Sequence, residues 1–134
     1  METEPASYAV IRQTTLSFDA TVETLRNALA DQGFGILCEI DVSATLKKKL
    51  DADYPKTLIL GACNPPLALR ALTAVPDISV FLPCNVVVRM HGAAVEVAVI
   101  NPLIMAEMIH HPEIGAVAQD ADARLRNVLN SLAA

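Results

Sequence analysis

Two polar dipeptides interrupt apolar stretches of the sequence, and each begins with a cysteine. Cys63 and Asn64 follow the run TLILGA, and Cys84 and Asn85 lie within the run FLPCNVVV. An asparagine before a proline is typical of a helix start, and free backbone N–H groups at such a start attract anions and lower a thiol pKa. Cys63 is therefore the strongest candidate for a reactive thiol.

Three interpretations of these two cysteines stay open. In the first, both are structural, because Cys84 shares a strand face with Val86 and free cysteine is commonly a small core residue. In the second, they line a ligand pocket. In the third, Cys63 is the nucleophile and Cys84 the resolving partner of a thiol redox or metal-linked protein. A zinc site needs more ligands than two cysteines provide, so we assign no metal-ligating residue, and the cofactors stay unknown.

Carboxylates form a second group of candidates. Glu39 and Asp41 alternate along one expected strand, and Glu96 lies in another. If these strands are neighbours, Glu39 and Glu96 converge. Burial of two adjacent carboxylates would move their pKa values apart. Otherwise the carboxylates face solvent or pair with Arg12 or Arg89.

Two further clusters have structural alternatives. The lysines at 47–49 spread around a short helix, which indicates a solvated face rather than a phosphate site. Met105, Met108, His110 and His111 resemble a soft-metal cluster, but such methionines commonly pack in cores and paired histidines in exposed loops. The sequence contains no glycine-rich phosphate loop, Ser-His-Asp pattern or CxxC motif, so no catalytic residue is assigned.

Composition limits the class of protein. The 134 residues suit a single domain over 1–134, and 53% of them are hydrophobic although only 4% are aromatic. So much aliphatic surface favours coverage by a second copy of the chain. A formal net charge of −5 argues against nucleic acid and anionic membranes as partners.

The location of the protein is predicted from its ends and its thiols. The first ten residues, METEPASYAV, lack the basic and then apolar pattern of a signal peptide, and no segment has the ~18 apolar residues of a membrane span. An odd number of cysteines at irregular spacing does not fit a disulfide framework. We expect reduced thiols in a cytoplasmic protein.

Hydrophobic periodicity predicts a mixed order of elements. Strands are expected at 7–14, 34–42, 56–62, 79–90 and 93–100, and helices at 19–32, 43–50, 65–75, 103–109 and 113–132. Within them, Asp19 and Ser43 are expected to cap helices, and Leu46 and Leu50 to face inward. Because the last two strands form a hairpin, we predict an α+β two-layer sandwich, with a mainly antiparallel sheet and helices on one face.

The second expected strand carries a specific prediction about its two faces. Unbroken alternation places Ile36, Cys38 and Ile40 on one face of the sheet. Glu39 and Asp41 then lie on the other.

The segments GFGILCEIDV, LKKKL, YPKTLILGACNP and FLPCNVVV together resemble the bacterial and archaeal family catalogued as domain of unknown function 302. The resemblance covers residues 15–102 and implies an α+β fold similar to one repeat of the TATA-binding protein, commonly as a homodimer. It implies neither an activity nor DNA binding. The family's hallmark positions fall on Glu39, Asp41, Lys48, Cys63, Asn64, Pro65, Pro83, Cys84 and Asn85.

We therefore expect a homodimeric small-ligand binding or accessory module with a pocket near the two Cys-Asn pairs. The expected ligand-binding residues are Glu39, Lys48, Cys63, Asn64, Cys84 and Asn85. One alternative is a thiol-based redox or metal-linked protein that uses the two cysteines. A second alternative is a purely structural dimerisation module, and whether the protein is an enzyme stays open.

Overall fold

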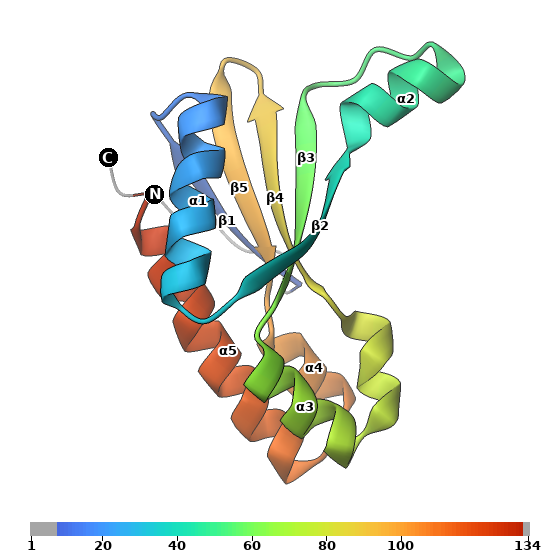
Figure 1. Cartoon of the computed structure of the whole chain (residues 1–134), viewed down its shortest axis with the longest axis vertical. Helices are drawn as coiled ribbons and strands as arrows, with labels where there is room; N and C mark the ends of the chain where they lie inside the picture. Colours follow the sequence, from blue (N-terminus) through green and yellow to red (C-terminus); the bar gives the residue numbers. More distant parts are fainter. Residues whose placement is uncertain (1–7, 133–134) are drawn as a thin grey trace.

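A five-stranded antiparallel sheet with helices on one face is the framework of the molecule (Figure 1). The computed structural model describes residues 8–132, so Ser7, expected at the start of the first strand, lies outside them. The elements in chain order are β1 (Ala9–Thr14), α1 (Phe18–Asp31), β2 (Gly35–Asp41), α2 (Val42–Leu50), β3 (Thr57–Cys63), α3 (Pro65–Ala74), the 3-10 helix η1 (Pro76–Phe81), β4 (Cys84–His91), β5 (Ala94–Ile100), α4 (Leu103–Met108) and α5 (Pro112–Asn130).

The strand order is β1-β5-β4-β3-β2, and every neighbouring pair runs antiparallel. This arrangement confirms the predicted α+β class with helices on one side of the sheet. No helix within residues 8–132 has the length and apolarity that crossing a bilayer requires.

The main core lies between the sheet and the helices α1 and α5. The central strands contribute valines, because alternate residues of a strand point to the same face. Fully buried examples are Val86, Val88 and Val97 from the sheet and Leu25, Leu29, Leu125 and Leu129 from the helices.

A second apolar cluster lies beyond one end of the sheet. There α3, η1, α4 and the first half of α5 pack together, at the lower end of Figure 1. Its buried members are Leu67, Ala71, Ile78, Met105, Ile114, Val117 and Ala121. Because β3 ends and β4 begins next to this cluster, the two cysteine positions lie at the junction of the two cores.

Two predicted helix caps are wrong by two residues each. Ser17 rather than Asp19 caps α1, since its hydroxyl accepts a backbone N–H of the first turn and Asp19 falls within that turn. Asp41 rather than Ser43 caps α2, because the Asp41 carboxylate accepts the N–H of Ala44 and the Ser43 hydroxyl. A carboxylate at the end of β2 therefore begins the next helix.

The strand expected from residue 79 begins later. Residues Pro76–Phe81 form the 3-10 helix, and β4 starts only at Cys84. Pro83 has no N–H to donate to a sheet, so the ladder can start only after it.

The alternation predicted for β2 is wrong because its register with β3 shifts between Ile36 and Cys38. The bulge leaves Leu37 without a pairing partner on β3, and the faces exchange beyond it. Ile36 and Glu39 therefore lie on the helix-covered side, where Ile36 packs on the core and Glu39 pairs with α1.

Helix α2 projects from the edge of the sheet, away from α1 and α5 (Figure 1). The prediction that Leu50 faces inward is wrong, since it is 71% exposed, while Leu46 is half-buried and α2 has no fully buried residue. The reason is position, because α2 extends beyond the edge strand and the two covering helices do not reach it.

Candidate functional site

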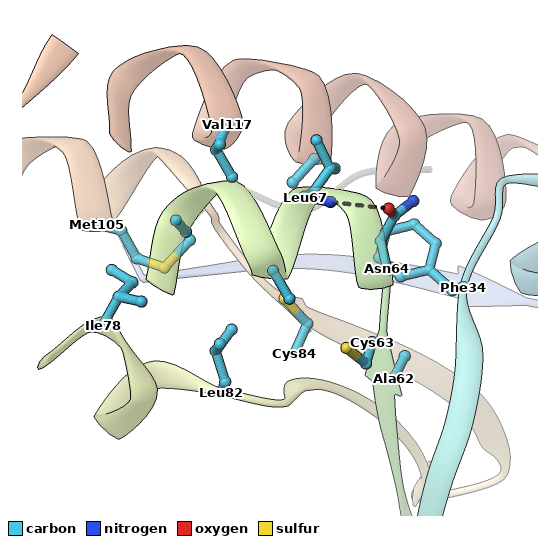
Figure 2. Close-up of a pocket in the computed structure, with 13 residues that line it drawn as sticks. Phe34, Ala62, Cys63, Asn64, Leu67, Ile78, Leu82, Cys84, Met105 and Val117 are labelled. Atoms are coloured by element: carbon cyan, nitrogen blue, oxygen red, sulfur yellow. Dashed lines mark hydrogen bonds between the residues drawn. The ribbon is translucent and has the colours of Figure 1, made fainter. Parts of the chain in front are cut away.

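A small cavity lies where β3 and β4 meet α3, at the junction of the two cores (Figure 2). Its volume is about 40 Å³. Its wall is almost wholly apolar apart from two thiols and one amide. The lining residues include Phe34, Ala62, Cys63, Asn64, Leu67, Ala71, Ile78, Leu82, Cys84, Met105, Val117 and Ala121.

Strand pairing brings the two cysteines to this cavity. Ala62 lies directly opposite Cys84, which places Cys63 one residue beyond that pair on the neighbouring strand. Both side chains line the cavity, with Cys84 buried and Cys63 half-buried (Figure 2). Burial, and then the neighbouring Cys63, raise the pKa of the Cys84 thiol from 9.0 to about 11. Cys84 is therefore a neutral thiol at physiological pH.

Asn64 forms part of the cavity wall, but its polar atoms are both engaged. Its Oδ1 accepts the backbone N–H of Leu67 at 3.3 Å, which caps α3. Its Nδ2 donates to the carbonyl oxygen of Gln32 at 3.3 Å, and Arg124 donates to the same oxygen at 2.9 Å. The amide thus links the end of α1 to the start of α3 and to α5.

The start of α3 offers no free donor to an anion, contrary to the expectation from its sequence. Pro65 and Pro66 occupy its first two positions and carry no N–H. The next two N–H groups, of Leu67 and Ala68, donate to the side chain and the backbone carbonyl of Asn64. The donors at the start of α3 are therefore engaged within the chain, and the cavity wall presents mainly sulfur and apolar groups.

Three of the six predicted ligand-binding residues come together, and three lie elsewhere. Cys63, Asn64 and Cys84 share the cavity. Asn85 is exposed, since successive residues of β4 alternate between the covered face and the open one. Glu39 forms an ion pair with Arg26 of α1, and Lys48 is exposed on α2.

The carboxylates Glu39 and Glu96 do not converge, because β3 and β4 separate their strands. Glu96 accepts hydrogen bonds from Arg89 at 2.9 and 2.6 Å and from Gln13 at 3.4 Å. Burial favours the neutral form of Glu96, but these hydrogen bonds and the Arg89 charge outweigh it and lower its pKa. Glu96 is thus a structural ion-pair partner, as the alternative interpretation held.

The methionines and histidines that resemble a soft-metal cluster in the sequence lie apart. Met105 is buried in the cavity wall, while Met108 is 64% exposed. His111 accepts the N–H of Glu113 and caps α5. Among residues 8–132 no group of three or more His, Cys, Asp or Glu side chains could hold a metal ion.

Sequence reasoning missed the far wall of the cavity. Phe34, Met105, Val117 and Ala121 come from segments distant in sequence from both cysteines. The helical spacing of Val117 and Ala121 showed that they face inward. The spacing did not show that Val117 and Ala121 would face the two cysteines.

A second, wider hollow of about 200 Å³ lies between α1 and the start of β3. Two of its charged groups, Lys56 and Asp19, pair with each other. Lys56 Nζ lies 4.4 Å from the centroid of the Phe18 ring and 3.9 Å from Asp19 Oδ1. The hydrogen bond from the Ala44 N–H lowers the pKa of Asp41, the helix cap at its edge.

Comparison with known proteins points to one family. The model of the family described as "Domain of unknown function DUF302" matches residues 10–132. The crystal structure of the uncharacterized conserved protein DUF302 from Bacillus stearothermophilus is similar, with a TM-score of 0.89 and 27% identity, covering 96% of this chain and 100% of that one. No curated protein matches the chain.

Proposed function

The chain belongs to the DUF302 family, and we propose that it acts as a binding module whose site is the cavity between Cys63 and Cys84. The observation that carries this proposal is the meeting of two thiols from neighbouring strands in one otherwise apolar cavity. Half-exposed Cys63 gives the occupant a route from solvent.

The size of the cavity limits the ligand to a few heavy atoms. Its volume of about 40 Å³ is a few times the roughly 10–15 Å³ that a cavity needs to hold one water molecule. Sites for drug-sized ligands and cofactors measure roughly 300–1,000 Å³. The ligand is therefore a small apolar molecule or a species that binds sulfur. A reducing cytoplasmic location would keep both thiols free.

Thiol redox chemistry is the second candidate, because Cys63 and Cys84 are adjacent in the sheet. The environment of Cys84 disfavours it. A neutral thiol with a pKa of about 11 is a poor attacking group at physiological pH, because the thiolate is the reacting form.

Entry of xenon, a small apolar probe, tests the binding proposal. We expect methyl NMR signals of Leu67, Ile78 and Val117 to shift under xenon pressure in the reduced protein. Signals of Ile59 and Val87, which alternate with buried residues on the sheet, should not shift. Equal or absent shifts at both sets would contradict the proposal.

A variant that fills the cavity provides the matched control. Ala71→Val adds two methyl groups to the wall, and Ala116→Val makes the same change at an exposed position of α5. Xenon shifts should disappear in Ala71→Val and persist in Ala116→Val. If the xenon shifts persist in both variants, the xenon binds outside this cavity.

We also propose that a second copy of the chain covers the β2–α2 arm, defined as residues 35–56. This segment exposes Leu37, Ile40, Leu50 and Tyr54, with exposed fractions of 67, 47, 71 and 56%. A nine-residue helix is marginal without tertiary packing, and α2 receives little from its own chain.

The charges of the arm favour a second copy over an unrelated partner. Lys48 and Lys49 are exposed on α2, and Asp51 and Asp53, which pair with Lys47 of the same chain, stay largely exposed. A twofold interface brings the same segment of both copies together, so lysines of one arm can meet carboxylates of the other. The arm is thus self-complementary in charge as well as apolar.

A further inference from the structure

The two thiols at the cavity come from separate strands. Ala62 pairs with Cys84, and Cys63 follows Ala62. Figure 2 shows both cysteine side chains beside α3, while Met105 lies at the other end of the cavity beside Ile78. The two thiols are therefore the pair that a single small occupant can contact together.

The cavity wall excludes several classes of metal ion. No carboxylate or imidazole lines it, and the oxygen of its one amide already accepts the Leu67 N–H. Mg²⁺ and Ca²⁺ require oxygen ligands, and a structural zinc site requires four ligands. Thiolate ligands select soft ions such as Cu(I), which two sulfur atoms can hold in a linear arrangement.

We propose that the ligand of this site is Cu(I), bound between Cys63 Sγ and Cys84 Sγ, an inference that rests on the proposed function because it names the ligand of the same cavity. A coordinating metal ion deprotonates a thiol, so each thiol, including the neutral Cys84, gives up its proton as the two copper–sulfur bonds form, and no oxidation state changes. A bare ion suits a cavity of about 40 Å³. Half-buried Cys63 provides the path by which the ion enters and the protons leave for solvent.

The chain offers matched controls for this assignment. Cys38 is an exposed thiol outside the cavity, so Cys38→Ser removes the competing surface ligand. Met105→Leu removes the remaining sulfur of the wall with little change in volume. Cys63→Ser tests one ligand, and Cys84→Ala tests the other while keeping its buried position apolar.

The experiment is an anaerobic titration of the reduced full-length Cys38→Ser protein with Cu(I) against the chelator bathocuproine disulfonate. We expect one Cu(I) per chain. Cys63→Ser and Cys84→Ala should each weaken binding by more than ~100-fold, because even groups that only support a metal ligand account for about 10–100-fold in affinity. Met105→Leu should change it by less than ~10-fold.

Unchanged affinity in Cys63→Ser or Cys84→Ala, or no binding in the Cys38→Ser background, would overturn the copper assignment. The xenon measurement separates this result from failure of the proposed function. If xenon still enters the cavity of a protein that does not bind Cu(I), the cavity is a site for an apolar ligand. If neither binds, both proposals are wrong.

Discussion

The side-chain amide of Asn64 hydrogen-bonds two helices at once, through the Leu67 N–H and the Gln32 carbonyl, each at 3.3 Å. An ordinary helix cap satisfies only its own helix. Here the cap also fixes where α3 lies relative to α1. Because α3 covers the cavity, this contact holds the wall of the site in place.

Asn64→Ala should destabilise the fold by about 1–2 kcal/mol, since it removes a cap and a buried hydrogen bond. Asn64→Asp separates the two roles, because aspartate caps helices as well as asparagine but cannot donate to the Gln32 carbonyl. Urea unfolding measures both. An Asn64→Asp protein as stable as wild type would contradict the role of the Gln32 contact.

The three cysteines should react with iodoacetamide in the order of their exposure, Cys38 first, Cys63 second and Cys84 last. Peptide mass spectrometry of the native reduced protein gives each rate as a function of pH. Cys84 should stay unmodified until the pH nears its pKa of about 11. Rapid labelling of Cys84 at neutral pH would show that its thiol is neither buried nor neutral.

The raised pKa of Cys84 also links stability to alkaline pH. Above pH 9.0 the thiol ionises in the unfolded chain but not in the native protein, so the unfolded state binds fewer protons. The free energy of unfolding should then fall by about 1.4 kcal/mol per pH unit until the native pKa is reached. A Cys84→Ala protein with the same slope between pH 9 and 11 would show that Cys84 is not the cause.

Arg89→Leu should destabilise the protein by about 1.5–3 kcal/mol, because it leaves the Glu96 carboxylate buried without its main partner. Adding Glu96→Leu should restore part of the loss. Lys47→Met breaks an exposed pair and should change stability by less than ~1 kcal/mol. If Arg89→Leu and Lys47→Met lower the free energy of unfolding in urea equally, Glu96 does not have a buried role.

Acid should reduce the contribution of Glu96. Its native pKa lies below its unfolded value, so this stability is present above the unfolded pKa and is lost as the pH falls through the native one. A Glu96→Gln protein should lack that part of the acid dependence. An unchanged acid profile would mean that other carboxylates account for it.

Sedimentation equilibrium tests the proposed dimer. Leu37→Glu and Leu50→Glu, both in the β2–α2 arm, should weaken association by at least ~10-fold. Val80→Glu is the control, since Val80 is 81% exposed in η1 and outside the arm. A wild-type monomer at micromolar concentration, or disruption by Val80→Glu alone, would contradict coverage of the arm by a second copy.

Local patterns predicted the elements well and their relative placement less well. The proline pair after Asn64 identified the start of α3, and the His91 and Gly92 turn identified the hairpin of β4 and β5. The bulge at Leu37 carries no glycine or proline, so nothing in the sequence indicated that the faces of β2 would exchange.

Three of the six residues expected at the site line one cavity. The two cysteines were singled out as unusual residues at strand ends, and they do meet. Glu39 and Lys48 were associated with them only by the family pattern, and strand order places them on the edge strand and its helix. Strand order depends on packing between distant segments, which periodicity along the chain does not contain.

A crystal structure of the reduced protein under xenon pressure tests the central claim most directly, because it locates the occupant itself. We expect one xenon atom in the cavity, in van der Waals contact with Cys63, Cys84 and Leu67. Xenon density only at other places on the protein, or none at a pressure that fills other apolar cavities, would show that the space between the two cysteines is not a binding site.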